Sequence, residues 1–251
     1  MRFLPQDEDK MSDFIKKLLD VCEKNQATRG LINEENAKVL ENLARHMQET
    51  NKELNLTAIC DDDGIILKHL VDSSAVVPFI EENAKIVDIG CGGGFPTLVI
   101  AALRPDVTVL GVDSVTKKVN YVKGAAELLN LKGVSVSNER AEVLGQGPLR
   151  EGFDIACARA VGRLNLICEL CMPLVKVGGC FLAMKSVTTK EELDEAKNAI
   201  SILGGKVEKV FSYTLTDGAE SLERTIIVIR KIAKTPTRYP RNNSQISKKP
   251  L

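Results

Sequence analysis

The stretch Ile86-Val87-Asp88-Ile89-Gly90-Cys91-Gly92-Gly93-Gly94-Phe95-Pro96 decides the fold of this chain. Val87 and Ile89 are typical of the end of a buried parallel strand, and Pro96 suits the first position of a following helix. A glycine cluster between strand and helix lets the backbone turn tightly and approach a ligand closely. Because ligands of open α/β sheets bind at such strand ends, we expect a binding site at this loop.

Short β-rich runs alternate with helical runs on both sides of this loop from Lys85 onward. This alternation predicts an α/β fold with a seven-stranded, mostly parallel sheet and helices on both faces. The expected helices are 96–103, 116–129, 164–174 and 190–203. The expected strands are 85–89, 108–113, 134–138, 153–158, 179–185, 206–215 and 225–232. No helix separates the last two strands, so they are expected to form an antiparallel hairpin at one edge.

Helical periodicity also marks the residues before the sheet, at 12–28, 33–50 and 65–79, with Ser12 and Asn33 as expected N-caps. The sequence therefore predicts three parts: an N-terminal helical region (1–83), a ligand-binding domain (84–233) and a basic C-terminal tail (234–251). No acidic residue follows Glu223, whereas eight lysines and arginines do. We expect the tail to be extended, either binding a polyanionic partner or simply solvated.

The composition is that of a soluble globular protein, with 251 residues, 44% hydrophobic and 27% charged. The apolar stretches are too short to cross a bilayer, and residues 1–10 lack the pattern of a secretory signal. We therefore expect a cytoplasmic protein without a membrane partner. The seven cysteines are expected to be reduced. Cys168 and Cys171 lie in an apolar helical stretch without a second ligand pair, so no metal site is predicted.

The spacing of the glycines separates two classes of cofactor. A dinucleotide site needs G-x-G-x-x-G, and Phe95 or Thr97 occupies the place of the third glycine, which disfavours a nicotinamide oxidoreductase. The pattern D-x-G-x-G-x-G fits from Asp88 to Gly94 and is similar to the first motif of Rossmann-like methyltransferases. Asp113 follows at the end of the next expected strand, where an acid can accept hydrogen bonds from both ribose hydroxyls.

Two further motifs are expected at the same edge of the sheet. Arg140-Ala141-Glu142 follows the third strand, where such folds often place a residue against the adenine ring. Ala158-Arg159-Ala160 ends the fourth strand. Arg159 is compatible with a surface role near a helix start, but the carboxyl end of a central strand favours a site role.

Together these motifs resemble the bacterial 16S rRNA (guanine-N7) methyltransferase G family, also called glucose-inhibited division protein B. The resemblance runs from about residue 51 to 251 and includes the stretches 55–59, 69–73, 239–241 and 248–251. It implies a class I methyltransferase fold, S-adenosylmethionine as cofactor, and 16S rRNA or the small ribosomal subunit as partner. Cys91, Thr97 and Ala158 depart from the residues that are common in the family.

The site residues fall into three predicted groups. The first is expected to bind the cofactor: Asp88, Gly90, Gly92, Gly94, Phe95, Asp113, Ala141, Glu142 and Arg159. The second is expected to position the substrate base: Asn55, His69, Asp72, Ser73, Arg159 and Lys185. The third is expected to contact phosphates: Lys52, Lys117, Lys118, Arg163 and the tail from Thr235. No obligate protein partner is expected.

Methyl transfer to guanine N7 needs no catalytic base, because N7 carries a lone pair in the neutral base. The sequence agrees with such chemistry: it contains neither an Asp-Pro-Pro-Tyr motif nor the Pro-Cys pair of cytosine-C5 enzymes. Two alternatives stay open at this stage. The chain is also compatible with a methyltransferase of another substrate, or with a non-catalytic cofactor-binding scaffold on the ribosome.

Overall fold

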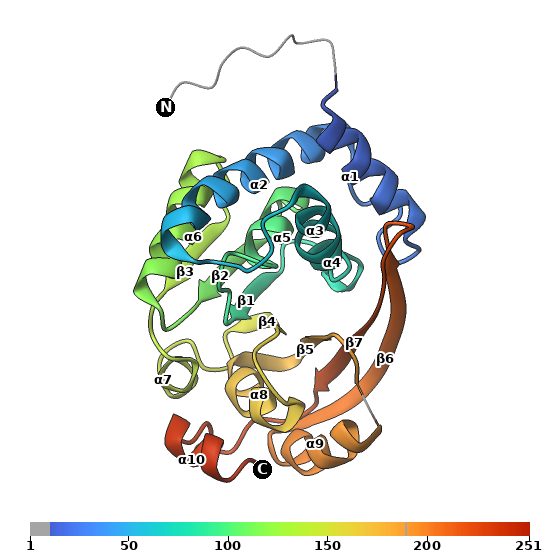
Figure 1. The fold of residues 1–251 in the computed structure, drawn as a ribbon. Coiled ribbons are helices and arrows are strands. Elements are labelled where there is room, and N and C mark those ends of the chain that lie inside the picture. The colour runs from blue at the N-terminus through green and yellow to red at the C-terminus, as the bar shows by residue number, and fades with distance from the viewer. Residues whose placement is uncertain (1–10, 189) are drawn as a thin grey trace.

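A seven-stranded mixed sheet forms the centre of the protein in the computed structural model, which describes residues 11–188 and 190–251 (Figure 1). The strand order is β3-β2-β1-β4-β5-β7-β6. Strands β1 to β5 pair in parallel, and β7 is antiparallel to both β5 and β6. The predicted fold class and terminal hairpin are thus confirmed. The strands are β1 Lys85–Ile89, β2 Thr108–Val112, β3 Val134–Ser137, β4 Phe153–Arg159, β5 Val175–Lys185, β6 Gly205–Thr216 and β7 Ser221–Lys231.

The order of the strands reverses between β1 and β4. From β1 the chain runs outward through β2 to β3, then returns to place β4 on the other side of β1. Asp88 of β1 pairs with Cys157 of β4, so the two strands end close together. A crevice forms at such a switch point, and here the glycine loop and Arg159 border it.

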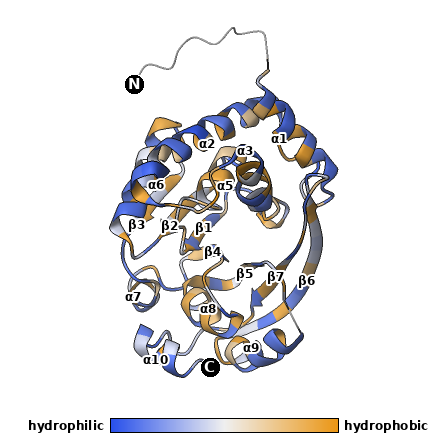
Figure 2. Ribbon diagram, viewed as in Figure 1, coloured by the Kyte–Doolittle hydropathy of each residue, from blue (hydrophilic) through white to orange (hydrophobic). Residues whose placement is uncertain are grey.

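Alternating strand residues supply two apolar cores, one on each face of the sheet. Ile86, Ile155 and Leu182 belong to the first core, whereas their neighbours Val87 and Ala156 belong to the second. Helices on the first face include α5 Thr97–Leu103 and α6 Thr116–Leu128. Those on the second face include α7 Ala141–Gln146, α8 Leu164–Cys171 and α9 Lys190–Ile202. Figure 2 shows the corresponding pattern, with apolar residues in the sheet and in α5 and α8 and polar residues along the outer α2.

The N-terminal helices cover the first face and share its core. Ser12 and Asn33 accept hydrogen bonds from the first turns of their helices, as predicted. The helix expected at 65–79 is wrong as a single element, because it divides into several short turns with a π-helical segment that contains His69. π-Helical turns are frequent at functional sites. The elements are α1 Asp13–Lys24, α2 Glu34–Leu54, α3 Asp62–Ile65, η1 Ile66–Val71, α4 Asp72–Ser74 and η2 Val77–Phe79; a further turn, η3 Met172–Leu174, follows α8.

The C-terminal residues pack against the domain, so the expectation of an extended tail is wrong. Tyr239 and Ile246 are buried in the second core, and α10 Asn243–Lys248 lies beside α8 (Figure 1). The side chain of Asn242 caps this short helix. The sequence did not predict this packing, because two apolar side chains and one N-cap are too few to produce a recognisable helical periodicity.

Residues 1–10, for which the sequence predicts no secretory signal, lie outside the described residues. Within residues 11–188 and 190–251, no helix combines the length and the apolar composition that crossing a membrane requires.

Candidate active site

The three glycines with positive φ in the glycine loop have different surroundings. Gly90, Gly92 and Gly94 have φ values of 77°, 53° and 90°. A Cβ on Gly90 would lie 2.6 Å from Cγ2 of Val161, and one on Gly94 would lie 2.5 Å from Cδ1 of Leu98. A Cβ on Gly92 would meet only the Gly90 carbonyl oxygen, at 3.8 Å. Gly90 and Gly94 therefore permit close packing, whereas Gly92 faces open space.

Three cavities lie in a row along the carboxyl edge of the sheet. The loop cavity, of about 350 Å³, is lined by Gly90, Gly92, Phe95 and Asp113 among others. The α7 cavity, of about 160 Å³, shares Gly90 and Asp113 with it and continues along Ala141 and Glu142. The arginine cavity, of about 320 Å³, shares His69, Arg159, Ala160 and Val161 with the loop cavity and adds Arg224 and Tyr213. A ligand in the loop and α7 cavities can therefore contact a second ligand in the arginine cavity.

Asp113 holds the glycine loop to the end of β2. Its Oδ2 accepts a hydrogen bond from the Gly92 amide at 3.0 Å, and its Oδ1 accepts one from the Val115 amide at 2.9 Å. Each carboxylate oxygen keeps a second lone pair, so both can still accept a ligand hydroxyl from the cavities that Asp113 lines. The predicted ribose contact is compatible with this position.

Asp88 lies beneath the loop and lines none of the three cavities. Its side chain is fully buried, and Oδ2 accepts a hydrogen bond of 2.6 Å from Oγ1 of Thr97. Burial raises the pKa of Asp88 to about 6, although the Thr97 hydroxyl opposes that rise. The position suits a residue that orients the loop.

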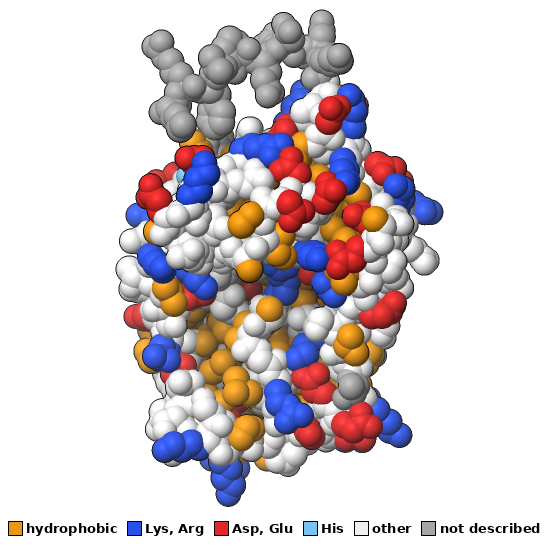
Figure 3. Space-filling view, in the orientation of Figure 1, with side chains coloured by type: hydrophobic (Ala, Val, Ile, Leu, Met, Phe, Trp, Pro, Cys, Tyr) orange, Lys and Arg blue, Asp and Glu red, His pale blue; other side chains and the backbone are white. Residues whose placement is uncertain are grey.

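A carboxylate joins two guanidinium groups at the mouth of the arginine cavity. Arg159 Nη1 lies 3.0 Å from Oδ2 of Asp72, and Arg224 Nε lies 3.1 Å from Oδ1 of the same residue. Arg159 also donates to the carbonyl of Lys68 at 2.8 Å. Figure 3 shows Lys and Arg side chains gathered around a hollow near the centre of this face. Arg224 was missed as a site residue, because the sequence analysis treated it only as one of the basic residues near the C-terminus.

His69 lies against the glycine loop. Its ring stacks on Phe95 with centroids 4.7 Å apart. Nδ1 lies 3.4 Å from Arg159 Nη2, and Nε2 lies 2.9 Å from Thr57 Oγ1, within hydrogen-bond distance. Burial and the charge of Arg159 lower the pKa of His69 to about 4. His69 is thus neutral at pH 7. Thr57 lies in the stretch 55–59 that carries the family resemblance, but it was not predicted as a site residue.

Two predicted substrate residues, Asn55 and Ser73, line none of the three cavities, whereas Lys185 lines the arginine cavity. Asn55 is exposed and ends α2 in a left-handed conformation with φ 51°. Ser73 is fully buried, away from the three cavities. Lys185 lines the arginine cavity but donates to the Gly162 carbonyl at 2.7 Å and pairs with Glu192 at 2.6 Å. Lys185 therefore holds the loop after β4 more directly than it offers a free charge.

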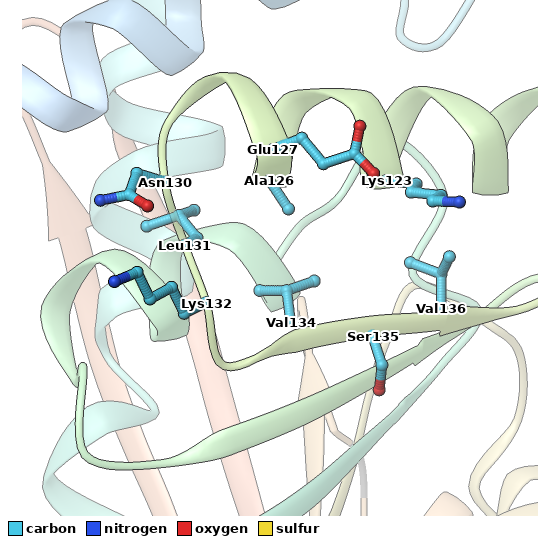
Figure 4. Close-up of a pocket in the computed structure, with 9 residues that line it drawn as sticks. All are labelled: Lys123, Ala126, Glu127, Asn130, Leu131, Lys132, Val134, Ser135 and Val136. Atoms are coloured by element: carbon cyan, nitrogen blue, oxygen red, sulfur yellow. The ribbon is translucent and has the colours of Figure 1, made fainter.

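A larger cavity, of about 660 Å³, lies away from the glycine loop between α6 and β3. Figure 4 shows side chains from both elements and from their connecting turn around it, with Lys123 and Glu127 on α6. It contains none of the loop residues or their partners. We therefore assign the chemistry to the three cavities at the carboxyl edge.

The cysteines Cys168 and Cys171 are buried in α8 as free thiols. Burial raises the pKa of both thiols well above the usual range. Within the described residues, no group of three or more His, Cys, Asp or Glu is placed to hold a metal ion.

Comparison with known proteins decides the family. The family model of rRNA small subunit methyltransferase G matches residues 36–222. The chain belongs to the rRNA small subunit methyltransferase G family. Three relatives carry the name "Ribosomal RNA small subunit methyltransferase G". The protein of Caldicellulosiruptor bescii is 46% identical over 81% of this chain and 87% of its own length. That of Acetivibrio thermocellus is 43% identical over 82% and 84%, and that of Staphylococcus carnosus is 41% identical over 92% and 97%.

Solved structures share the fold at low sequence identity. The cyclase SpnF has a TM-score of 0.52 and 14% identity, and the alignment covers 65% of this chain and 82% of that chain. TYW2 of M. jannaschii, in complex with AdoMet, has a TM-score of 0.50 and 14% identity, with coverage of 61% and 71%. These likenesses concern the fold alone.

This methyltransferase family uses S-adenosylmethionine, and the edge of the sheet fits that cofactor. Gly92 leaves space beside the loop that a Cβ would begin to fill. The loop cavity and the α7 cavity meet at Gly90 and Asp113, which gives an elongated molecule two connected compartments. The free lone pairs of Asp113 lie where these compartments join.

Proposed function

We propose that the protein transfers a methyl group from S-adenosylmethionine to N7 of a specific guanine in the 16S rRNA of the small ribosomal subunit. The observation that carries this proposal is the shared wall of the loop and arginine cavities, formed by His69, Arg159, Ala160 and Val161. A cofactor held by the glycine loop would present its methyl group toward a base held beside Arg159.

The proposed cofactor contacts follow the two connected cavities. Gly90, Gly92 and Phe95 line the loop cavity together with Arg159, and Asp113 lies at the junction. Ala141 and Glu142 line the α7 cavity, which we assign to the adenosine end. Asp88 and Gly94 act from beneath the loop, because neither lines a cavity: Asp88 bonds to Thr97, and Gly94 packs on Leu98.

The chemistry needs positioning more than proton transfer. When bound, S-adenosylmethionine supplies an electrophilic methyl group on a sulfonium. Guanine N7 attacks with a lone pair that is available in the neutral base, so no residue has to remove a proton first. His69 fits this requirement, because its pKa of about 4 leaves it uncharged at pH 7. An efficient general base has a pKa near the working pH, and that of His69 lies well below it. Its Nε2 already contacts the Thr57 hydroxyl, at 2.9 Å.

The groups around the arginine cavity suit a nucleotide. Within the described residues, Arg159 and Arg224 share one carboxylate, so their two positive charges exceed the negative charge of Asp72 and favour a phosphate. Arginine also stacks on bases and can donate a hydrogen bond to guanine O6, which leaves the N7 lone pair free. An enzyme that acts on a base takes it out of its stack or uses an unpaired one. We assign the flipped guanine to the boundary between the two cavities.

Lysines near the loop are proposed to hold the RNA backbone. Lys117 and Lys118 begin α6 beside the loop cavity, and neither forms an ion pair within residues 11–188 and 190–251. Lys52 and Arg163 are already paired with Glu49 and Glu195 on the surface, which makes them weaker candidates. The partner is rRNA, free or assembled into the small subunit, and we propose that the protein acts in the cytoplasm, where that substrate is found in bacteria.

Nucleoside analysis tests the proposal. Unmethylated small-subunit RNA, free or assembled, is incubated with the protein and methyl-labelled S-adenosylmethionine, then digested to nucleosides. The label is expected in 7-methylguanosine from one position. Label in another nucleoside would indicate a methyltransferase of different specificity. Cofactor binding without transfer to any form of the RNA would favour the scaffold.

A further inference from the structure

The C-terminal segment, defined as residues 235–248, reaches the cofactor side of the sheet. Asn243 at the start of α10 lines the α7 cavity together with Asp113, Ala141 and Glu142. Asn243 is exposed, and within the described residues its side chain makes no hydrogen bond. Its amide is therefore available to a molecule in that cavity.

A buried ion pair anchors this segment to α8. Glu169 is fully buried, and its Oε1 accepts hydrogen bonds from the backbone amide and Nε of Arg241 at 2.9 and 2.8 Å. Oε2 accepts a third from Nη2 of Arg241 at 2.6 Å. The next residue on α8, Leu170, lines the α7 cavity. Because a buried carboxylate is costly without its partner, Glu169 fixes the position of Arg241 and hence of Asn243, two residues further on.

The same segment is fastened to α7, the other helix of that cavity. Gln146 Nε2 donates to the carbonyls of Pro240 at 2.9 Å and Thr237 at 3.2 Å. Pro240 packs so closely on Gly145 that a Cβ there would lie 2.9 Å from the proline Cγ. Ala141 and Glu142, at the other end of this short helix, line the cavity.

Buried polar contacts hold the beginning of the segment. Thr235 accepts a hydrogen bond of 2.6 Å from Nζ of Lys231, whose side chain is fully buried. Arg150 donates to the carbonyls of Thr235 and Tyr239, both at 2.7 Å. The segment is thus fixed to the domain at three places: at its start, at α7 and at α8.

We propose that the C-terminal segment forms one wall of the adenosine end of the cofactor site, with Asn243 contacting the cofactor and Arg241 acting as a positioning residue through Glu169. The inference rests on the proposed function insofar as the α7 cavity is assigned to adenosine. It also limits the expected RNA-binding role of the basic end. Arg241 and Lys231 are used within the fold, which leaves Lys234, Arg238, Lys248 and Lys249 exposed.

Binding of two nucleosides to the full-length protein, measured by calorimetry without RNA, tests this inference. S-adenosylhomocysteine contains the adenosine and amino-acid ends, whereas 5′-methylthioadenosine contains only the adenosine end. Asn243→Ala is expected to raise both dissociation constants by about fivefold, as the loss of one hydrogen bond does. Arg241→Met is expected to raise both by at least as much. Ser247→Ala, on an exposed position of the same helix, is the matched control and should change neither.

Two results would overturn the inference. One is a set of dissociation constants for Asn243→Ala within twofold of the parent protein. The other is a weakening that affects S-adenosylhomocysteine but not 5′-methylthioadenosine, since the segment would then act at the amino-acid end. Asn243 is exposed, so its variant should fold, and thermal unfolding verifies this for Arg241→Met. Failure of the proposed function would appear differently, as methyl transfer to an atom other than guanine N7.

Discussion

Arg159 and Asp72 form an ion pair of 3.0 Å between the end of β4 and the N-terminal helices, with only 16% and 8% of their side chains exposed. Asp72 also holds Arg224 from β7, so three distant parts of the chain meet at one carboxylate. This contact fixes the wall that separates the proposed cofactor and base positions. The N-terminal helices thereby contribute to the site, beyond covering the sheet.

Asp72→Asn is expected to lower both stability and activity. It leaves two poorly exposed guanidinium groups side by side, at a cost of about 2 to 3 kcal/mol in the free energy of unfolding. kcat/KM for RNA should fall at least about tenfold, because misplaced groups cost that much in rate. Urea unfolding and steady-state kinetics measure the two effects. Asp62→Asn is the control, since its partner Arg45 is 42% exposed and the loss should be about 0.5 kcal/mol. Equal losses in the two variants would contradict this role of Asp72.

His69 should make the protein less stable in acid. Its pKa is about 4 in the folded protein and near 6.5 unfolded, so the unfolded chain takes up the proton first. The stabilising contribution is complete above pH 6.5 and disappears as the pH falls toward 4, by about 3 kcal/mol at most. Urea unfolding of the parent and of His69→Gln at pH 7.5 and 5 measures it. The variant should lose less stability on acidification; parallel losses would show that His69 is not responsible.

The hydroxyl of Thr97 should matter more at high pH. Thr97→Val removes the donor to fully buried Asp88, so the charged carboxylate becomes more costly. The folded pKa of about 6 lies above the unfolded value, which means that the cost is absent at low pH and complete above pH 6. Thr97→Val should therefore destabilise by about 1 to 3 kcal/mol at pH 8 and by less at pH 5. Thr97→Ser keeps the donor and serves as control. A loss that does not vary with pH would argue for a packing effect of the methyl groups instead.

Lys117 and Lys118 are expected to bind phosphate. Replacing either by Ala should weaken RNA binding and reduce the slope of log affinity against log salt by about 0.7 to 0.9. Filter binding between low and moderate salt measures the slope. Lys16→Ala on α1 is a suitable control, because this exposed lysine is already paired with Asp13. Slopes that match the control would remove these lysines from the interface.

The sequence predicted what depends on local pattern. Strand and helix alternation, together with one glycine loop, was sufficient for the fold class, and Asp113 was found because its place follows from a strand end. Arg224 and Thr57 were missed because they reach the site through tertiary contacts with Asp72 and His69. Asn55 and Ser73 line none of the three cavities for a related reason. A motif gives neighbours in the chain, while the π-helical turn and the end of α2 decide which side chains face a cavity.

The position of the C-terminal segment likewise depends on tertiary contacts that the local sequence does not predict. Its composition indicated an extended basic tail, either solvated or bound to a polyanion, yet Glu169 and Arg241, 72 positions apart, form an ion pair in which Glu169 is fully buried. Such a pair has no local signature. The residues that resemble the family ending indicated the family but did not predict that this segment lies beside the α7 cavity.

A single-atom change in the RNA tests the central claim most directly. Small-subunit RNA is assembled with 7-deazaguanosine, which replaces N7 by a carbon, only at the position where the methyl group is mapped. Label transfer from S-adenosylmethionine is then compared with RNA that carries guanosine there. We predict that transfer at this position disappears while RNA binding stays within about threefold, because the nucleophile alone is missing. Undiminished transfer to the 7-deazaguanosine RNA would contradict methylation at guanine N7.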